Sequence, residues 1–188
     1  MSIRAVIFDF FGVICSDDYW RYVRRDRQTD SEFRAFSEEV NLGKMPWQTF
    51  VEKVAKTTNT SVEAVNKMYE SERIDPRVAA LIDELHKDYK TALLTNAHHE
   101  FIDDVLKQNH LATLFDEVFV SSRLGVVKPD PAIFEYALEK LSVKPEEVVY
   151  IDDLERHAAS AREVGMQAIV YKDFEQMRHE LEAILSKQ

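Results

Sequence analysis

Polar residues suited to phosphoryl-transfer chemistry follow four short apolar runs in this chain. A carboxylate can act as a nucleophile or a metal ligand, a hydroxyl and an amide can hold phosphate oxygens, and an ammonium group can neutralise an anionic intermediate. The runs are rich in β-branched and aromatic residues, as buried parallel strands are, and ligands bind outside the carboxyl ends of such strands. We therefore expect one crevice to be shared by Asp9, Thr95, Asn96, Lys128, Asp152 and Asp153.

Each of these residues also has an ordinary structural interpretation. Asp9 precedes Gly12, which lets backbone come close to a ligand, but an aspartate here could simply cap a turn. Thr95 and Asn96 either hold phosphate oxygens or cap the next helix. Lys128 either neutralises an anion or is solvated.

The adjacent aspartates Asp152 and Asp153 give the most specific signal. Two neighbouring carboxylates repel each other, and the pair becomes favourable when an oxygen-seeking cation such as Mg²⁺ binds. We therefore expect a magnesium site at this strand end.

The elements that must position these residues alternate along most of the chain. Apolar residues at three- and four-residue spacings, without any strand signal, fill the stretch from Asp17 to about Glu72, with breaks at Gly43, Pro46 and 57–61. Pro76 suits the first turn of a helix capped by Asp75, and Gly165 suits a helix end. The predicted strands are 3–10, 91–94, 117–120, 147–151 and 167–170, and further helices are predicted near 98–109, 130–141, 154–164 and 173–186.

This order predicts an α/β fold with a doubly wound parallel sheet and a small all-helical cap inserted after the first strand. We expect the core to comprise 1–14 and 75–188, and the cap 15–74. A chain of 188 residues is long enough for one such core with a small inserted lobe.

Charge and composition exclude several classes of function. A formal net charge of −10 opposes binding to nucleic acid and to anionic membranes, because both reward clustered basic residues. No apolar stretch reaches the length needed to span a bilayer, and the residues before the first strand do not resemble a signal peptide, so we expect none. The single cysteine, Cys15, suits a reducing cytoplasm. We expect a cytoplasmic protein, either a monomer or a homodimer.

Together the motifs resemble those of the haloacid dehalogenase superfamily, and the resemblance covers nearly the whole chain. Residues 9–13 look like its first motif, 93–96 its second, 125–131 its third and 150–153 its fourth. The motifs occur in the right order, and the helical insert occupies the position of a small cap.

The resemblance implies an aspartyl-enzyme mechanism on a small phosphorylated metabolite. Asp9 would attack phosphorus, Thr95 and Lys128 would bind the phosphoryl oxygens, and water would hydrolyse the intermediate. Mg²⁺ would be held, directly or through water, by Asp9, the backbone carbonyl of Phe11, Asp152 and Asp153.

Phe11 departs from the pattern of the superfamily's phosphatases. Most of them carry a second aspartate there as general acid and base, and the loss of such help costs about 10²–10⁴ in rate. The superfamily's 2-haloacid dehalogenases carry an aromatic residue at this position and need no metal, but they lack the paired aspartates that this chain keeps. A magnesium-dependent phosphatase is therefore favoured, and the alternatives are a 2-haloacid dehalogenase and a binding or regulatory protein that has lost turnover.

Other residues have a structural interpretation and a functional one. Asp17 and Asp18 either cap the first insert helix or replace the missing proton donor, and His98 and His99 either begin a helix or serve the site. His157 stands where relatives place Asn or Asp, which would alter an outer contact of the metal site. The insert's arginines face solvent or substrate: Arg21, Arg24, Arg25 and Arg27. Its aromatic residues are expected to pack a small core: Tyr19, Trp20, Phe33, Phe36, Trp47 and Phe50.

Overall fold

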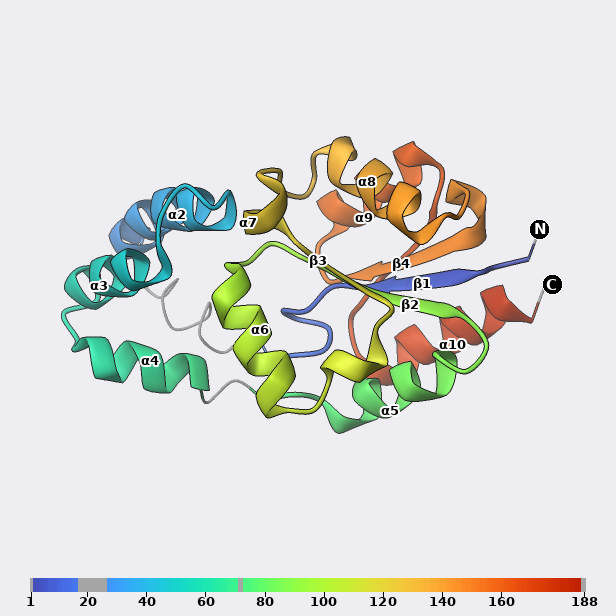
Figure 1. Cartoon of the computed structure of the whole chain (residues 1–188), viewed down its shortest axis with the longest axis horizontal. Coiled ribbons are helices and arrows are strands. Elements are labelled where there is room, and N and C mark those ends of the chain that lie inside the picture. Colours follow the sequence, from blue (N-terminus) through green and yellow to red (C-terminus); the bar gives the residue numbers. More distant parts are fainter. Residues whose placement is uncertain (1, 17–26, 71–72, 187–188) are drawn as a thin grey trace.

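The fold centres on a five-stranded parallel sheet with the order β3-β2-β1-β4-β5 (Figure 1). The computed structural model describes residues 2–16, 27–70 and 73–186. Because β1 is the middle strand, the residue that follows it lies between the carboxyl ends of β2 and β4. The strands are β1 (Ala5–Phe8), β2 (Lys90–Thr95), β3 (Glu117–Val120), β4 (Val148–Asp152) and β5 (Gln167–Val170).

Helices cover both faces of the sheet, as the alternation of side chains along β1 requires. Val6 and Phe8 belong to an apolar cluster with α5 (Pro76–Leu85), α6 (His99–Gln108) and α10 (Phe174–Leu185). Ala5 and Ile7 point to the opposite face, which α8 (Pro131–Leu141) and α9 (Glu155–Val164) cover. The predicted doubly wound α/β core is thus confirmed.

Two predicted helix ends are also confirmed. The side chain of Asp75 accepts a hydrogen bond from the backbone N–H of Arg77, and Pro76 is the first residue of α5. Gly165 ends α9 in the left-handed region at a φ of 105°, which glycine adopts at little cost.

Three helices, α2 (Arg27–Asn41), α3 (Trp47–Thr57) and α4 (Val62–Glu70), lie together beyond the carboxyl end of the sheet (Figure 1). The connections between them fall at the predicted breaks. Phe33 and Phe50 are buried, and they belong to the apolar cluster that also covers one face of the sheet. Trp47 stacks on Phe101 of α6, so the insert packs on the core as well as on itself. Tyr19 and Trp20 lie outside the described residues.

Some local structure differs from the sequence-based expectation. The first strand ends at Phe8 rather than near residue 10, because the carbonyl of Phe10 accepts hydrogen bonds from the N–H groups of Ile14 and Cys15 and closes a compact loop. A short helix, α7 (Ser121–Leu124), follows β3, and single 3₁₀ turns occupy η1 (Ala112–Leu114) and η2 (Pro145–Glu147). Within the described parts of the chain, none of the helices has the length and apolar character needed to cross a membrane.

Candidate active site

Asp9 lies at the carboxyl end of the middle strand, at the floor of a small pocket. Its side chain is buried, and Oδ1 accepts hydrogen bonds from the backbone N–H of Phe10 at 2.7 Å and from Lys128 Nζ at 2.8 Å. Among the described residues no group bonds Oδ2 of Asp9. The carboxylate is therefore fixed through one oxygen, and the other remains free to react.

Lys128 is buried between three oxygen atoms. Its Nζ donates to the carbonyl of Leu94 at 2.9 Å, to Asp9 at 2.8 Å and to Asp152 Oδ2 at 2.8 Å. Asn96 holds its backbone from both sides, because Lys128 N–H donates to Asn96 Oδ1 at 2.8 Å and Asn96 Nδ2 donates to the Lys128 carbonyl at 2.9 Å. Asn96 therefore positions the lysine, and the N-cap of α6 is His98 rather than Thr95 or Asn96.

Asp152 is completely buried and receives hydrogen bonds from four groups. Besides Lys128, the hydroxyl of Tyr150, the backbone N–H of Leu154 and His157 Nδ1 all donate to its two oxygens. So many donors leave little room for direct metal binding at Asp152, and its visible role is to hold Lys128 and His157.

The electrostatics of this group follow from burial and from the shared lysine. Burial and the charge of Asp152 raise the pKa of Asp9 well above its ordinary value, with Lys128 opposing the rise. Burial would raise the pKa of Asp152 too, but Lys128 and His157 lower it overall. Burial opposes the charge on Lys128, yet Asp9 and Asp152 raise its pKa. The lysine is therefore charged, and the site disfavours a full negative charge on Asp9 unless a further cation is present.

Thr95 ends β2 beside Asp9, and its hydroxyl oxygen has no partner. It is the one buried side-chain polar atom without a hydrogen bond in the part of the chain that the structure describes. An unpaired buried hydroxyl costs about 1–3 kcal/mol. Since Thr95, Asp9 and Lys128 line the same pocket of about 120 Å³, this hydroxyl is available to a ligand there.

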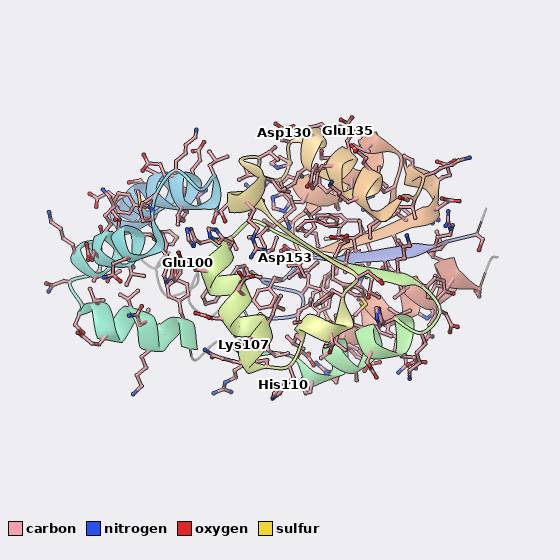
Figure 2. All side chains as sticks on the ribbon, in the orientation of Figure 1. Glu100, Lys107, His110, Asp130, Glu135 and Asp153 are labelled. Carbon is pink, nitrogen blue, oxygen red and sulfur yellow. The ribbon has the colours of Figure 1, made fainter. Side chains whose placement is uncertain are left out.

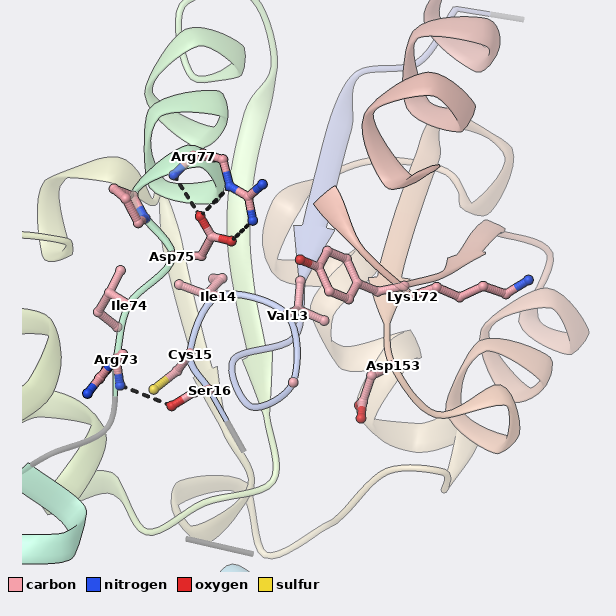
Figure 3. A pocket seen from close by; sticks show the side chains of 13 residues that line it. Val13, Ile14, Cys15, Ser16, Arg73, Ile74, Asp75, Arg77, Asp153 and Lys172 are labelled. Carbon is pink, nitrogen blue, oxygen red and sulfur yellow. Dashed lines mark hydrogen bonds and ion pairs between the residues drawn. The ribbon is translucent and has the colours of Figure 1, made fainter. Parts of the chain in front are cut away.

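Asp153 lies against the loop that follows β1. A Cβ added to Gly12 would stand only 2.6 Å from Asp153 Oδ2, so this glycine makes room for the carboxylate next to the Phe11 peptide. Asp153 lines the pocket of Asp9 and also a larger cavity of about 690 Å³ beside residues 12–16 (Figure 3). In the view of Figure 2 it projects over the middle of the molecule, whereas Lys107 and His110 lie at the edge. Asp9 and Asp153 thus border one space from different strands.

Phe11 lies at the mouth of the same pocket and packs on other rings. Its ring stacks on Phe101 at 5.9 Å and 13° and meets Phe10 edge-on at 5.1 Å. Position 11 therefore joins the loop after β1 to the apolar contact between core and insert.

Sequence reasoning missed three residues of this site. Tyr150 lies two positions before Asp152 on β4 and therefore shares its face, a strand signal that could have revealed it. Asn41, from the end of α2, and Arg156, from the first turn of α9, line the pocket, but nothing in their local sequence marks them.

The remaining candidates fall elsewhere. His98 and His99 do not line the pocket of Asp9, and His99 bonds Ser122. His157 does line it, but its Nδ1 donates to Asp152. Asp17, Asp18, Arg21, Arg24 and Arg25 lie outside the described residues, and only the backbone of Arg27 is described.

Curated relatives match all or part of the chain. Bifunctional epoxide hydrolase 2 of Sus scrofa is 26% identical over 225 aligned positions, which cover 100% of this chain and 40% of that protein. Phosphoglycolate phosphatase of Vibrio vulnificus is 30% identical over 91 residues, covering 48% of this chain and 40% of that protein. The chain thus spans about two fifths of the length of both relatives.

Solved structures share the fold over nearly the whole chain. A HAD-like family hydrolase from Porphyromonas gingivalis superposes with a TM-score of 0.81 at 21% identity, covering 100% of both chains. A HAD family enzyme from Bacteroides thetaiotaomicron, solved with magnesium and inorganic phosphate, superposes with a TM-score of 0.78 at 18% identity, covering 95% of this chain and 99% of that one.

A family model, described as haloacid dehalogenase-like hydrolase, matches residues 3–165. That range includes all four motifs and the residues gathered around Asp9. It takes in the whole insert and four of the five strands. The chain belongs to the haloacid dehalogenase-like hydrolase family.

Proposed function

We propose that the chain is a Mg²⁺-dependent phosphatase that acts on a small phosphorylated metabolite through a covalent aspartyl-phosphate on Asp9. The observation that carries this proposal is the buried, unpaired hydroxyl of Thr95 beside Asp9 and Lys128. A phosphoryl oxygen would accept a hydrogen bond from this hydroxyl while Lys128 balances the negative charge.

The donor set at the strand ends fits Mg²⁺. Hard cations prefer oxygen ligands, and Asp9, Asp153 and the carbonyl of Phe11 supply them around one space. One possible ligand atom from each of Asp9, Asp152 and His157 also lies within 4.8 Å of the others. This group is a less suitable metal site, because the Lys128 ammonium already bridges the two carboxylates and His157 donates to Asp152. The ion would therefore be held by Asp9, Phe11 and Asp153. Asp152 would support the site indirectly, by holding Lys128 or by binding a water ligand of the ion.

In the first step, Oδ2 of Asp9 attacks phosphorus in line with the scissile bond. A bond forms between the carboxylate oxygen and phosphorus, and the bond from phosphorus to the leaving oxygen breaks. Thr95 and Lys128 hold the phosphoryl oxygens through this change. When bound, Mg²⁺ supplies positive charge that offsets the repulsion between the carboxylate and the phosphate.

In the second step, water attacks the phosphorus of the aspartyl-phosphate, releases inorganic phosphate and restores the Asp9 carboxylate. Phe11 cannot donate a proton to the leaving oxygen or take one from this water. His157 is also occupied, because its Nδ1 donates to Asp152 and its Nε2 accepts from Arg156 Nε at 3.3 Å. We therefore expect substrates whose leaving groups need little protonation to react best.

The comparisons include phosphatases, but 2-haloacid dehalogenases are also among the similar solved structures, so the site itself must decide between the two. One curated relative is named a phosphoglycolate phosphatase, and one structural neighbour holds magnesium and phosphate. An aromatic residue at position 11 is the feature that favours a 2-haloacid dehalogenase, whose chemistry needs neither a metal nor a second aspartate. Asp153 beside Asp9 weighs against that alternative, because two carboxylates around one small space call for a cation.

The discriminating experiment compares phosphate release and halide release. Wild type, Asp9→Asn and the control Asp104→Asn, an exposed aspartate of α6, are assayed on acetyl phosphate and on 2-chloropropionate, with Mg²⁺ and with a chelator. We expect phosphate release that disappears in Asp9→Asn and on chelation but persists in Asp104→Asn. Halide release that survives chelation would instead identify a dehalogenase. No turnover in any arm would identify a protein that binds without catalysis.

We also propose that 15–74 forms a cap on a core made of 1–14 and 75–188. The grouping of α2, α3 and α4 beyond the sheet supports this division, and Asn41 brings the cap to the pocket. Changing Asn41 should therefore alter substrate preference without altering Mg²⁺ affinity.

A further inference from the structure

Arg156 carries a positive charge at the rim of the catalytic pocket, and no acidic residue in the described parts of the chain forms an ion pair with it. It lies in the first turn of α9, lines the pocket and is exposed. Its acidic neighbour Glu155 instead pairs with Arg162 at 2.8 Å. Among the described residues no carboxylate pairs with Arg156.

The guanidinium group is nevertheless held in place by a neighbouring histidine. Arg156 Nε donates to His157 Nε2 at 3.3 Å, and His157 is itself buried and fixed to Asp152 through Nδ1. Because Nε is used in this way, the two terminal nitrogens remain, and their N–H groups form the edge that binds a carboxylate through two parallel hydrogen bonds.

The position of Arg156 shows which part of a substrate it meets. Asp9, Thr95 and Lys128 are buried at the floor, where the phosphoryl group must lie to react. Arg156 at the rim therefore faces the leaving group. Asn41, whose side chain has no hydrogen bond among the described residues, reaches the same rim from the cap.

The size of the pocket limits that leaving group. Its volume of about 120 Å³ is well below the range of about 300–1,000 Å³ that is usual for larger ligands. A phosphoryl group fills much of it and leaves room for a few further atoms. A planar carboxylate fits the guanidinium edge and takes less space than a second phosphoryl group.

We infer that Arg156 binds a carboxylate on the leaving group, so that the substrate is a short phosphorylated carboxylic acid. This inference rests on the proposed phosphatase function and assigns specificity to a residue at the rim. Mutual repulsion would otherwise exclude a carboxylate from a pocket that already contains Asp9 and Asp153, and the guanidinium group offsets it.

The test uses pairs of compounds that differ only in the charge of one group. Turnover of 2-phosphoglycolate is compared with turnover of its neutral amide, and calorimetry with Mg²⁺ compares the binding of phosphonoacetate and phosphonoacetamide. In wild type we expect the carboxylates to be favoured by about 10- to 100-fold in both measurements. Arg156→Gln should remove this preference. Arg156→Lys should keep part of it, because a lysine retains the charge but cannot donate two parallel hydrogen bonds to a carboxylate.

Arg178→Gln serves as the matched control, since Arg178 is exposed on α10 and pairs with Glu182. It should keep the wild-type preference. Equal turnover of the acid and its amide by wild type, or an equal loss of both in Arg156→Gln, would overturn the assignment while the phosphatase function stands. A binding preference that depends on Arg156, in a protein that turns over neither these esters nor acetyl phosphate, would instead keep the assignment and refute the function.

Discussion

Lys128 Nζ lies 2.8 Å from Asp152 Oδ2, and both side chains are almost completely buried, with 1% and 0% of their surface exposed. Asp9 shares the same ammonium group at 2.8 Å. Two carboxylates thus depend on one cation in a place that is largely shielded from solvent. In such a setting the cost of losing one partner exceeds what the intact pair contributes, because the remaining charge stays buried.

Lys128→Met should therefore lower the free energy of unfolding by about 3–5 kcal/mol as well as abolish activity. The exposed Lys140→Met should change it by less than about 0.5 kcal/mol. In the double variant Lys128→Met/Asp152→Asn the loss should be smaller than the sum of the single losses, because the stranded charge is removed. Urea denaturation of wild type, Lys128→Met, Asp152→Asn, the double variant and the control measures this, and additive losses would show that the two residues are not coupled.

Gly12→Ala should weaken Mg²⁺ binding, because the new Cβ would stand 2.6 Å from Asp153 Oδ2 and displace that carboxylate. Gly125→Ala is a matched control, since Gly125 has a similar φ of 69° against 78° at Gly12 but no atom within 4 Å of the added Cβ. Both variants should lose about 1–2 kcal/mol of stability from backbone strain. Calorimetric titration with Mg²⁺ should separate them, and equal affinities would contradict the assignment of Asp153 as a ligand.

Phe11 predicts a steep dependence of rate on the leaving group. Acyl and aryl phosphates should react far faster than alkyl phosphates, because no acid protonates the departing oxygen. Phe11→Asp should accelerate the alkyl esters selectively, whereas Phe11→Asn, which loses the ring but gains no acid, should not. The measurement is the slope of log rate against leaving-group pKa. A shallow slope in wild type would mean that another residue already supplies the proton, and Asp17 and Asp18 would be mutated first.

Asp75 predicts an acid-sensitive helix start. Its hydrogen bonds to Arg77 lower the pKa of Asp75 below its ordinary value of 3.8, although burial opposes this shift. Its ionised form therefore stabilises the fold fully above that ordinary value, and the stabilisation is lost as the pH falls through the lower pKa of the folded state. The difference in unfolding free energy between wild type and Asp75→Asn should accordingly shrink between about pH 6 and about pH 3.

The sequence predicted those parts of the fold and the site that depend on local pattern. Short apolar runs followed by polar residues were enough to predict that Asp9, Thr95, Lys128 and Asp153 would border one crevice. The two hydrogen bonds between Asn96 and the backbone of Lys128 were not predictable, because they depend on how a loop 32 residues away folds back. The position of Arg156 was not predictable for a similar reason, since only the packing of α9 against the sheet brings this arginine to the rim of the pocket.

The contact between Phe11 and Phe101 affects how this site can change by single substitutions. A mutation that restores an aspartate at position 11 would add a proton donor and, in the same step, remove a stacked ring from the junction of core and insert. The same substitution would therefore both increase the rate and reduce the packing. A second change that refilled the space beside Phe101 would separate the two effects. The packing of Phe11 thus couples the chemistry of the site to the contact between core and insert.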